Sequence, residues 1–154
     1  MRIFTVAFFG HRYVDNIIKV ENLLEEQIRT ILDKYAFVDF LVGRNGEFDQ
    51  CVSSSILRVQ KNYRSDNSAL VLILPYLTAE YINNMENYHD YYTEVEVSHA
   101  ASVAYPKSAI QIRNREMVDR ADLIICYIKR ENGGAWQTIK YARKCGKTVI
   151  NLAE

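Results

Sequence analysis

The sequence has no excess of either charge and few cysteines, and each of these absences excludes a class of protein. Among 154 residues, 19 basic side chains balance 19 acidic ones, so no overall field attracts nucleic acid or an anionic membrane. The three cysteines, Cys51, Cys126 and Cys145, form no CxxC or Cys–His pair. They predict neither a zinc site nor a disulfide framework, and they fit a reducing cytoplasm.

The chain also lacks a long apolar segment, an internal repeat and any low-complexity region. Its N-terminal apolar run, residues 3–9, has no cleavage site and is far too short to cross a bilayer, so we interpret it as a strand. The length suits one domain with a core large enough to hold a small-ligand crevice. We therefore expect a single cytoplasmic domain over residues 1–154, with no membrane or nucleic-acid partner.

Apolar runs alternate with helical patterns along most of the chain. The strand-like runs are residues 3–9, 37–42, 69–74, 123–128 and 148–152. Asp15 or Asn16 caps the first helix, and a Ser108–Gln111 capping box opens another that runs to about Arg120. This alternation predicts right-handed parallel connections in a Rossmann-like three-layer α/β/α sandwich with a mainly parallel five-stranded sheet.

Residues 76–105 interrupt the alternation. The stretch follows Pro75, has no clear periodicity and carries six tyrosines among polar residues. A long connection inside a compact domain is commonly a lid, a binding loop or a contact surface. We expect a Tyr-rich loop or lid here. Its histidines and carboxylates match no metal-site spacing, so we expect no metal centre, and we expect no cofactor.

Three glycine-bearing turns each follow an apolar run and precede a helical one: residues 10–12, 43–46 and 132–134. In a parallel sheet all three lie at the carboxyl-terminal edge, where open α/β sheets bind ligands. Backbone N–H groups at such turns point the same way, and the helix dipole adds partial positive charge. The turns therefore predict a phosphate pocket.

In the first turn, Arg12 can form a two-point contact with phosphate. Alternatively, it pairs with a nearby carboxylate at a surface turn. His11 has no evident nucleophile or carboxylate partner, which makes it a weak acid–base candidate. We count His11 only among the ligand-binding residues.

In the second turn, the Asn45–Gly46 pair favours a tight turn with positive φ. Asp49 either caps the following helix or accepts hydrogen bonds from ribose hydroxyl groups. Glu47 is either a catalytic carboxylate for a glycosidic reaction or an ordinary first-turn glutamate favoured by the helix dipole.

The helix over residues 108–120 has polar residues on its inward side. Its apolar stripe is Ile110, Met117 and Ala121, and Arg113 and Asn114 share that side. A buried, unpaired guanidinium is costly, so Arg113 meets a carboxylate or faces a polar crevice. The alternatives are snorkelling or a pair with Glu116 at helical spacing.

In the third turn, Gly133 and Gly134 allow a phosphate to approach the backbone at the start of a helix. Trp136 follows directly. Its ring either stacks on a base or packs against the protein.

Taken together, residues 42–49, 113–119, 133–135 and 147–152 resemble the SLOG superfamily, most closely its small stand-alone bacterial and phage members. The resemblance covers nearly the whole chain and is weakest over residues 76–105. It implies a Rossmannoid fold that binds nucleotides or nucleotide derivatives, often as a homo-oligomer. Carried over by motif, the implied ligand contacts are Gly10, Arg12, Gly43, Gly46, Asp49, Arg113, Gly133 and Gly134.

The LOG phosphoribohydrolases of this superfamily carry a proline-glycine-glycine-x-glycine-threonine stretch followed by a catalytic glutamate. Here Trp136 or its neighbour replaces the third glycine, and Gln137 and Thr138 stand where the carboxylate is needed. An amide cannot fully substitute for a carboxylate at an oxocarbenium-like transition state. We therefore do not expect LOG-type hydrolysis.

The sequence thus predicts a nucleotide sensor or sequestering protein. Arg12 and Arg113 supply positive charge, Asp49 contacts the sugar, and Trp136 or a tyrosine covers the base. On this hypothesis, Arg113→Ala abolishes binding without unfolding the chain. One alternative is an N-glycosidase or deoxyribosyltransferase-like enzyme that uses Glu47, or else Glu94 or Glu96. Another is an interaction protein that uses the Tyr-rich stretch.

Overall fold

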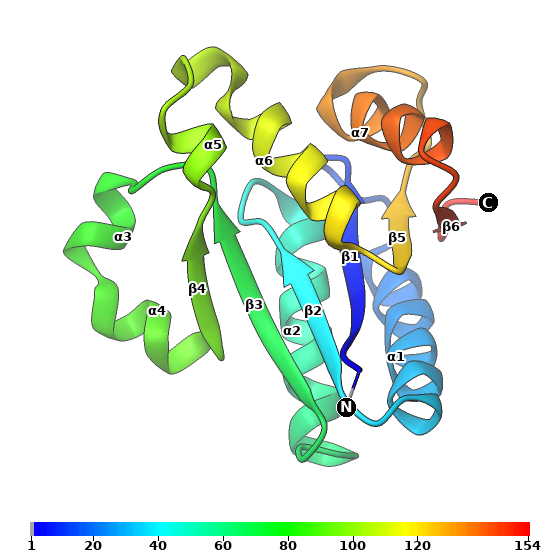
Figure 1. Cartoon of the computed structure of the whole chain (residues 1–154). Helices are drawn as coiled ribbons and strands as arrows, with labels where there is room; N and C mark the ends of the chain where they lie inside the picture. The colour runs from blue at the N-terminus through cyan, green and yellow to red at the C-terminus, as the bar shows by residue number, and fades with distance from the viewer. Residues whose placement is uncertain (1) are drawn as a thin grey trace.

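The computed structural model describes residues 2–154 and shows a three-layer α/β/α sandwich (Figure 1). Six strands, all parallel, lie in the order β4-β3-β2-β1-β5-β6. They are β1 (Phe4–Gly10), β2 (Val38–Val42), β3 (Ser68–Leu74), β4 (Glu94–Val97), β5 (Leu123–Tyr127) and β6 (Thr148–Asn151). The predicted Rossmann-like architecture is confirmed, and the sheet has one strand more than the five expected.

Helices cover both faces of the sheet and enclose two apolar cores. On one face lie α1 (Ile17–Lys34) and α2 (Glu47–Asn62), and on the other α6 (Pro106–Arg120) and α7 (Gly133–Lys144). The four central strands, β1, β2, β3 and β5, are mostly apolar because both of their sides are covered. Among residues 2–154, no helix is long and apolar enough to span a bilayer.

The two predicted helix starts have different outcomes. Asn16 caps α1 as expected, since its side chain accepts a hydrogen bond from the backbone nitrogen of Lys19 at 3.3 Å. The capping box expected at Ser108 is wrong. Helix α6 begins two residues earlier, at Pro106, whose fixed φ suits the first helical position. Ala109 is buried and Ile110 is exposed, so Ile110 does not belong to the inward stripe.

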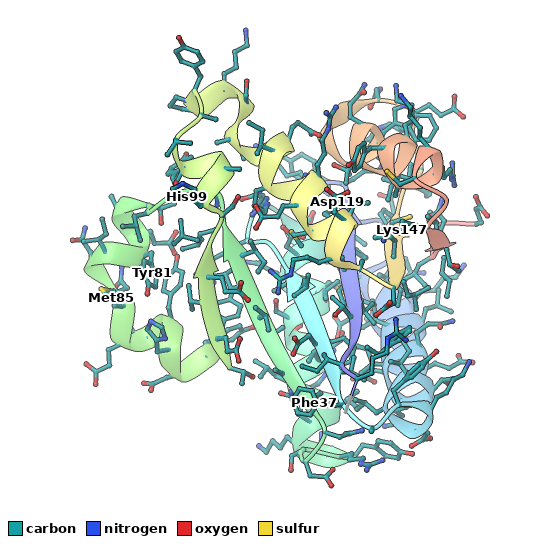
Figure 2. The ribbon with its side chains drawn as sticks, viewed as in Figure 1. Phe37, Tyr81, Met85, His99, Asp119 and Lys147 are labelled. Carbon is teal, nitrogen blue, oxygen red and sulfur yellow. The ribbon has the colours of Figure 1, made fainter. Side chains whose placement is uncertain are left out.

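The Tyr-rich stretch is ordered structure, which corrects the expected loop. It forms α3 (Ala79–Asn83), α4 (Met85–Tyr91), strand β4 and α5 (His99–Ser102). Figure 2 shows Tyr81 on the side of α3 that faces the sheet, while Met85 lies on the outer side. Tyr81, Tyr88 and Tyr92 are buried in the core that α1 and α2 cover. Half of the six tyrosines therefore hold the α3–α4 pair against the domain.

Candidate functional site at the carboxyl edge of the sheet

A cavity of about 690 Å³ opens beside the second glycine turn, where β2 ends and α2 begins. Helices α1 and α2 form one side, and the α3–α4 pair forms the other. The charged lining residues are Glu21, Arg44, Glu47, Asp49 and Glu80, and the aromatic ones are Tyr88, Tyr91 and Tyr92. Its volume lies in the range of small-molecule sites.

Asp49 lies in the first turn of α2 and lines this cavity. One carboxylate oxygen, Oδ2, accepts a hydrogen bond from the backbone nitrogen of Asn45 at 2.8 Å. Burial raises the pKa of Asp49, although the Asn45 amide and the positive charge of Arg113 oppose that shift. The residue that caps α2 is Gly46, with an extended φ of 176°. The expected N-cap role of Asp49 and the expected positive φ at residues 45–46 are therefore both wrong.

Gly43 lies between Asp49 and Arg113. A Cβ atom at position 43 would be 3.1 Å from Oδ2 of Asp49 and 3.3 Å from each terminal nitrogen of Arg113. Three predicted ligand residues, from the β2–α2 turn, α2 and α6, thus converge on one point. The glycine lets the two opposite charges approach the backbone.

Arg113 is only 2% exposed and is held by protein acceptors. Its Nη1 donates to the carbonyl of Ile73 at 2.7 Å, and its Nε donates to Oδ1 of Asn114 at 2.8 Å. Asn114 in turn donates to the hydroxyl of Thr138 at 3.1 Å. The expected alternative, a pair with Glu116, is not formed. Arg113 therefore ties β3, α6 and α7 together, and its terminal nitrogens lie against Gly43 without lining the cavity.

His11 fills the crevice between β1 and β5, where the strand order reverses. Its Nε2 accepts hydrogen bonds from the backbone nitrogens of Lys129 and Arg130, at 3.0 and 3.1 Å. Burial lowers the pKa of His11, and so does the positive charge of Arg130. An imidazole nitrogen that accepts two N–H groups is unprotonated. Two amides of this loop therefore already have a protein acceptor.

The first and second glycine turns pack directly against each other. The backbone nitrogen of Glu47 donates to the carbonyl of Arg12 at 2.8 Å. Oε1 of Glu47 accepts a hydrogen bond from the backbone nitrogen of Val14 at 3.3 Å. A Cβ at Gly46 would lie 2.7 Å from the Cα of Arg12, and one at Gly10 would overlap the ring of Phe48. Glycine at 10 and 46 is thus required by packing.

The third turn lies apart from the cavity, since none of its residues lines it. Gly133 has a positive φ of 89° with open space around it. The carbonyl of Gly134 accepts hydrogen bonds from the side chains of Gln111 and Thr138. Trp136 is half-buried against the core under α7, which is the packing alternative of the two that the sequence left open.

Arg44 is a site residue that the sequence analysis did not single out. Its Nη1 donates to the hydroxyl of Tyr92 at 3.0 Å, and its Nη2 donates to Oε1 of Glu80 at 3.0 Å. The guanidinium also lies 4.7 Å from the centroid of the Tyr88 ring. Its place in the second glycine turn was visible in the sequence, but its partners come from a stretch 36 to 48 residues further on.

Ser53 is the second residue that was missed. It lies on α2, lines the cavity and is buried. Its hydroxyl oxygen has no hydrogen-bond partner among residues 2–154. A buried hydroxyl without a partner costs free energy, so this group is available to a ligand at low cost.

No family model matches the chain, and no curated protein matches it. The architecture is Rossmann-like, as the sequence predicted. Among solved structures, the chain is similar to DNA processing protein A (DprA) from Streptococcus pneumoniae, with a TM-score of 0.67 and 15% identity. It is also similar to DNA processing protein A from Helicobacter pylori, with a TM-score of 0.64 and 13% identity.

The chain corresponds to only part of each of these proteins. The first match covers 96% of this chain and 49% of the S. pneumoniae protein. The second covers 95% of this chain and 63% of the H. pylori protein, whose structure was described for its binding of single-stranded DNA. At these identities the likeness concerns the fold.

Proposed function

We propose that the cavity binds a nucleotide or nucleotide derivative, and that the protein acts as a nucleotide sensor or sequestering protein. The observation that carries this proposal is the cavity itself, about 690 Å³ beside a glycine turn at the carboxyl edge of a parallel sheet. Ligands of open α/β sheets bind outside this edge. The likeness of the fold to DprA supports a nucleotide-related ligand.

The lining residues suit the sugar and the base. Asp49 and Glu47 present carboxylate oxygens, which accept hydrogen bonds from ribose hydroxyl groups. Tyr91 is 39% exposed at the cavity wall, with its ring available for stacking on a base. The expected homo-oligomer stays a prediction.

A thermal-shift panel tests the proposal, with mononucleotides, dinucleotides, cyclic nucleotides and ADP-ribose-type compounds. A ligand that binds only the folded chain raises the melting temperature in a dose-dependent way. Tyr91→Ala is expected to weaken binding about tenfold through lost stacking. The matched control is Tyr105→Ala, because Tyr105 is 85% exposed and does not line the cavity. A panel without any shift contradicts the proposal.

One observation favours an enzyme as the second candidate. Glu47 and Asp49 both line the cavity, and the raised pKa of Asp49 suits a group that gives its proton to a departing base. Water would attack C1′ while the N-glycosidic bond breaks. Glu94 and Glu96, by contrast, do not line the cavity, and Glu96 pairs with Arg120. Release of free base that is lost in Glu47→Gln and Asp49→Asn would favour hydrolysis over simple binding.

Single-stranded DNA is a further ligand to compare, because the H. pylori protein binds it. The charges of this chain disfavour a strand with many phosphates. Its net charge is zero, and the cavity holds four carboxylates against one guanidinium. Strand binding depends on neutralising many phosphates. Fluorescence anisotropy with a labelled oligonucleotide is expected to show no binding at physiological salt.

The interaction-protein alternative loses half of the tyrosines of its proposed surface. Tyr81, Tyr88 and Tyr92 are buried and belong to the core. Of the six tyrosines, only Tyr76, Tyr91 and Tyr105 are exposed.

A further inference from the structure

The cavity's only guanidinium, Arg44, lies within reach of an exposed carboxylate. Among the described lining residues, Arg44 is the one cation, and Glu80 is its hydrogen-bonded carboxylate partner at 3.0 Å. The side chains of Arg44 and Glu80 are 39% and 60% exposed. An ion pair this accessible to water contributes little to stability, so it opens at low cost.

Two contacts besides the one with Glu80 hold the guanidinium. Tyr92 accepts a hydrogen bond from Nη1, while Tyr88 lies against the guanidinium. Both tyrosines are buried and packed in the core. The bond to Glu80 uses Nη2, a separate nitrogen. An anion that replaces Glu80 therefore meets a charge already held in place, which limits the entropy lost on binding.

We propose that Arg44 binds the anionic group of the cavity's ligand, and that Glu80 occupies this position when the cavity is empty. This inference rests on the proposed function and deepens it, because it makes a phosphorylated ligand the preferred one. A phosphate dianion offers a stronger partner to a guanidinium than a single carboxylate does. Glu80 thus acts as a built-in competitor for phosphate.

The sequence analysis expected Arg12 and Arg113 to bind phosphate, and both are placed less favourably for this role than Arg44. Arg113 is buried and already donates to Ile73 and Asn114. Arg12 does not line the cavity. The anion-binding role that the sequence assigned to Arg12 and Arg113 therefore passes to Arg44.

Calorimetric titration with matched pairs tests the proposal: AMP and adenosine, GMP and guanosine, CMP and cytidine, UMP and uridine. The readout is the ratio of nucleotide to nucleoside affinity. Arg44→Gln is expected to lower this ratio about tenfold, the loss of one charge-assisted contact. Glu80→Gln is expected to raise nucleotide affinity several-fold and leave nucleoside affinity unchanged.

The Glu80→Gln variant protects the test against a trivial loss of folding, since a gain in affinity cannot come from an unfolded chain. Tyr92→Phe is the second control, because it removes one hydrogen bond to Arg44 and keeps the charge. If each nucleotide and nucleoside binds Arg44→Gln as well as it binds the wild-type protein, this inference is overturned. The proposed function then remains intact. Absence of binding by every pair, together with a thermal-shift panel that shows no shift, overturns the proposed function itself.

Discussion

Nε2 of His11 lies 3.0 Å from the backbone nitrogen of Lys129 and joins the end of β1 to the loop after β5. The next nitrogen along the loop, that of Arg130, donates to the same atom. The sequence analysis expected the third glycine turn, residues 132–134 further along this loop, to bind phosphate. The two amides before that turn bind a side chain, and the turn does not line the cavity, so we place the candidate site at the cavity beside α2 and the α3–α4 pair.

The contact makes stability depend on pH. Burial lowers the pKa of His11 below its ordinary value of 6.5, so the unfolded chain binds the proton more readily than the folded one. The contribution of unprotonated His11 to the free energy of unfolding is complete above about pH 6.5. It is lost as the pH falls toward the pKa of His11 in the folded chain. Urea unfolding measures the free energy of unfolding at each pH. Below about pH 6.5, this free energy is expected to fall more steeply with decreasing pH for the wild type than for His11→Gln. Parallel pH profiles would contradict this role.

Arg113→Ala is expected to destabilise the fold, unlike the outcome predicted from the sequence. The variant leaves the carbonyl of Ile73 without its donor and removes the positive charge beside Asp49. Loss of one member of a buried polar set costs about 3 kcal/mol. Chemical denaturation measures this directly. A variant with wild-type stability but no nucleotide binding would restore the original hypothesis of a free phosphate-binding arginine.

Two glycine substitutions distinguish the energetic cost of a steric overlap from the cost of a positive φ. Gly10→Ala places a methyl group into the ring of Phe48 and is expected to cost about 3 kcal/mol. Gly133→Ala meets open space and is expected to cost about 1 kcal/mol, from its positive φ alone. Thermal unfolding of both variants compares them. The reverse order of stabilities would mean that the first turn is loosely packed.

Ser53→Ala is expected to leave stability unchanged or raise it by about 1 kcal/mol, because it removes a buried hydroxyl with no partner among residues 2–154. The same change is expected to weaken nucleotide binding about fivefold, because Ser53 lines the cavity. Ser55→Ala is the control. Ser55 is buried on the same helix, but its hydroxyl accepts a hydrogen bond from Arg58 and lies outside the cavity. It should lose stability and keep its affinity.

Much of the sheet could be predicted from the sequence because four of its strands, β1, β2, β3 and β5, are largely buried. The apolar runs at residues 3–9 and 69–74, for example, match β1 and β3 to within one residue. Strand β4 was missed because it lies at the exposed edge, where Glu94 and Glu96 alternate with valines. The helices α3 and α4 before it have five and seven residues, too few to show a clear period.

The sequence could predict only those residues of the candidate site whose positions follow from the order of strands and helices in the sheet. Parallel strands bring Gly43 and Asp49 to the edge near which Arg113 lies on α6. The sequence pattern predicted the turn at this edge, and the family resemblance added Arg113 to it. The contacts of Arg44 with Tyr92 and Glu80 depend on how a separate stretch folds back over α2. No local spacing encodes that placement.

The central claim is that a nucleotide binds in the cavity beside α2 and the α3–α4 pair. Its most direct test is a titration, followed by NMR of backbone amides, with the mononucleotide that gives the largest thermal shift. We expect the amides of Gly43, Asp49, Ser53 and Tyr92 to shift with one common dissociation constant, while those of Gly133 and Gly134 stay in place. Shifts confined to Gly133 and Gly134 would contradict the claim and return the site to the third glycine turn.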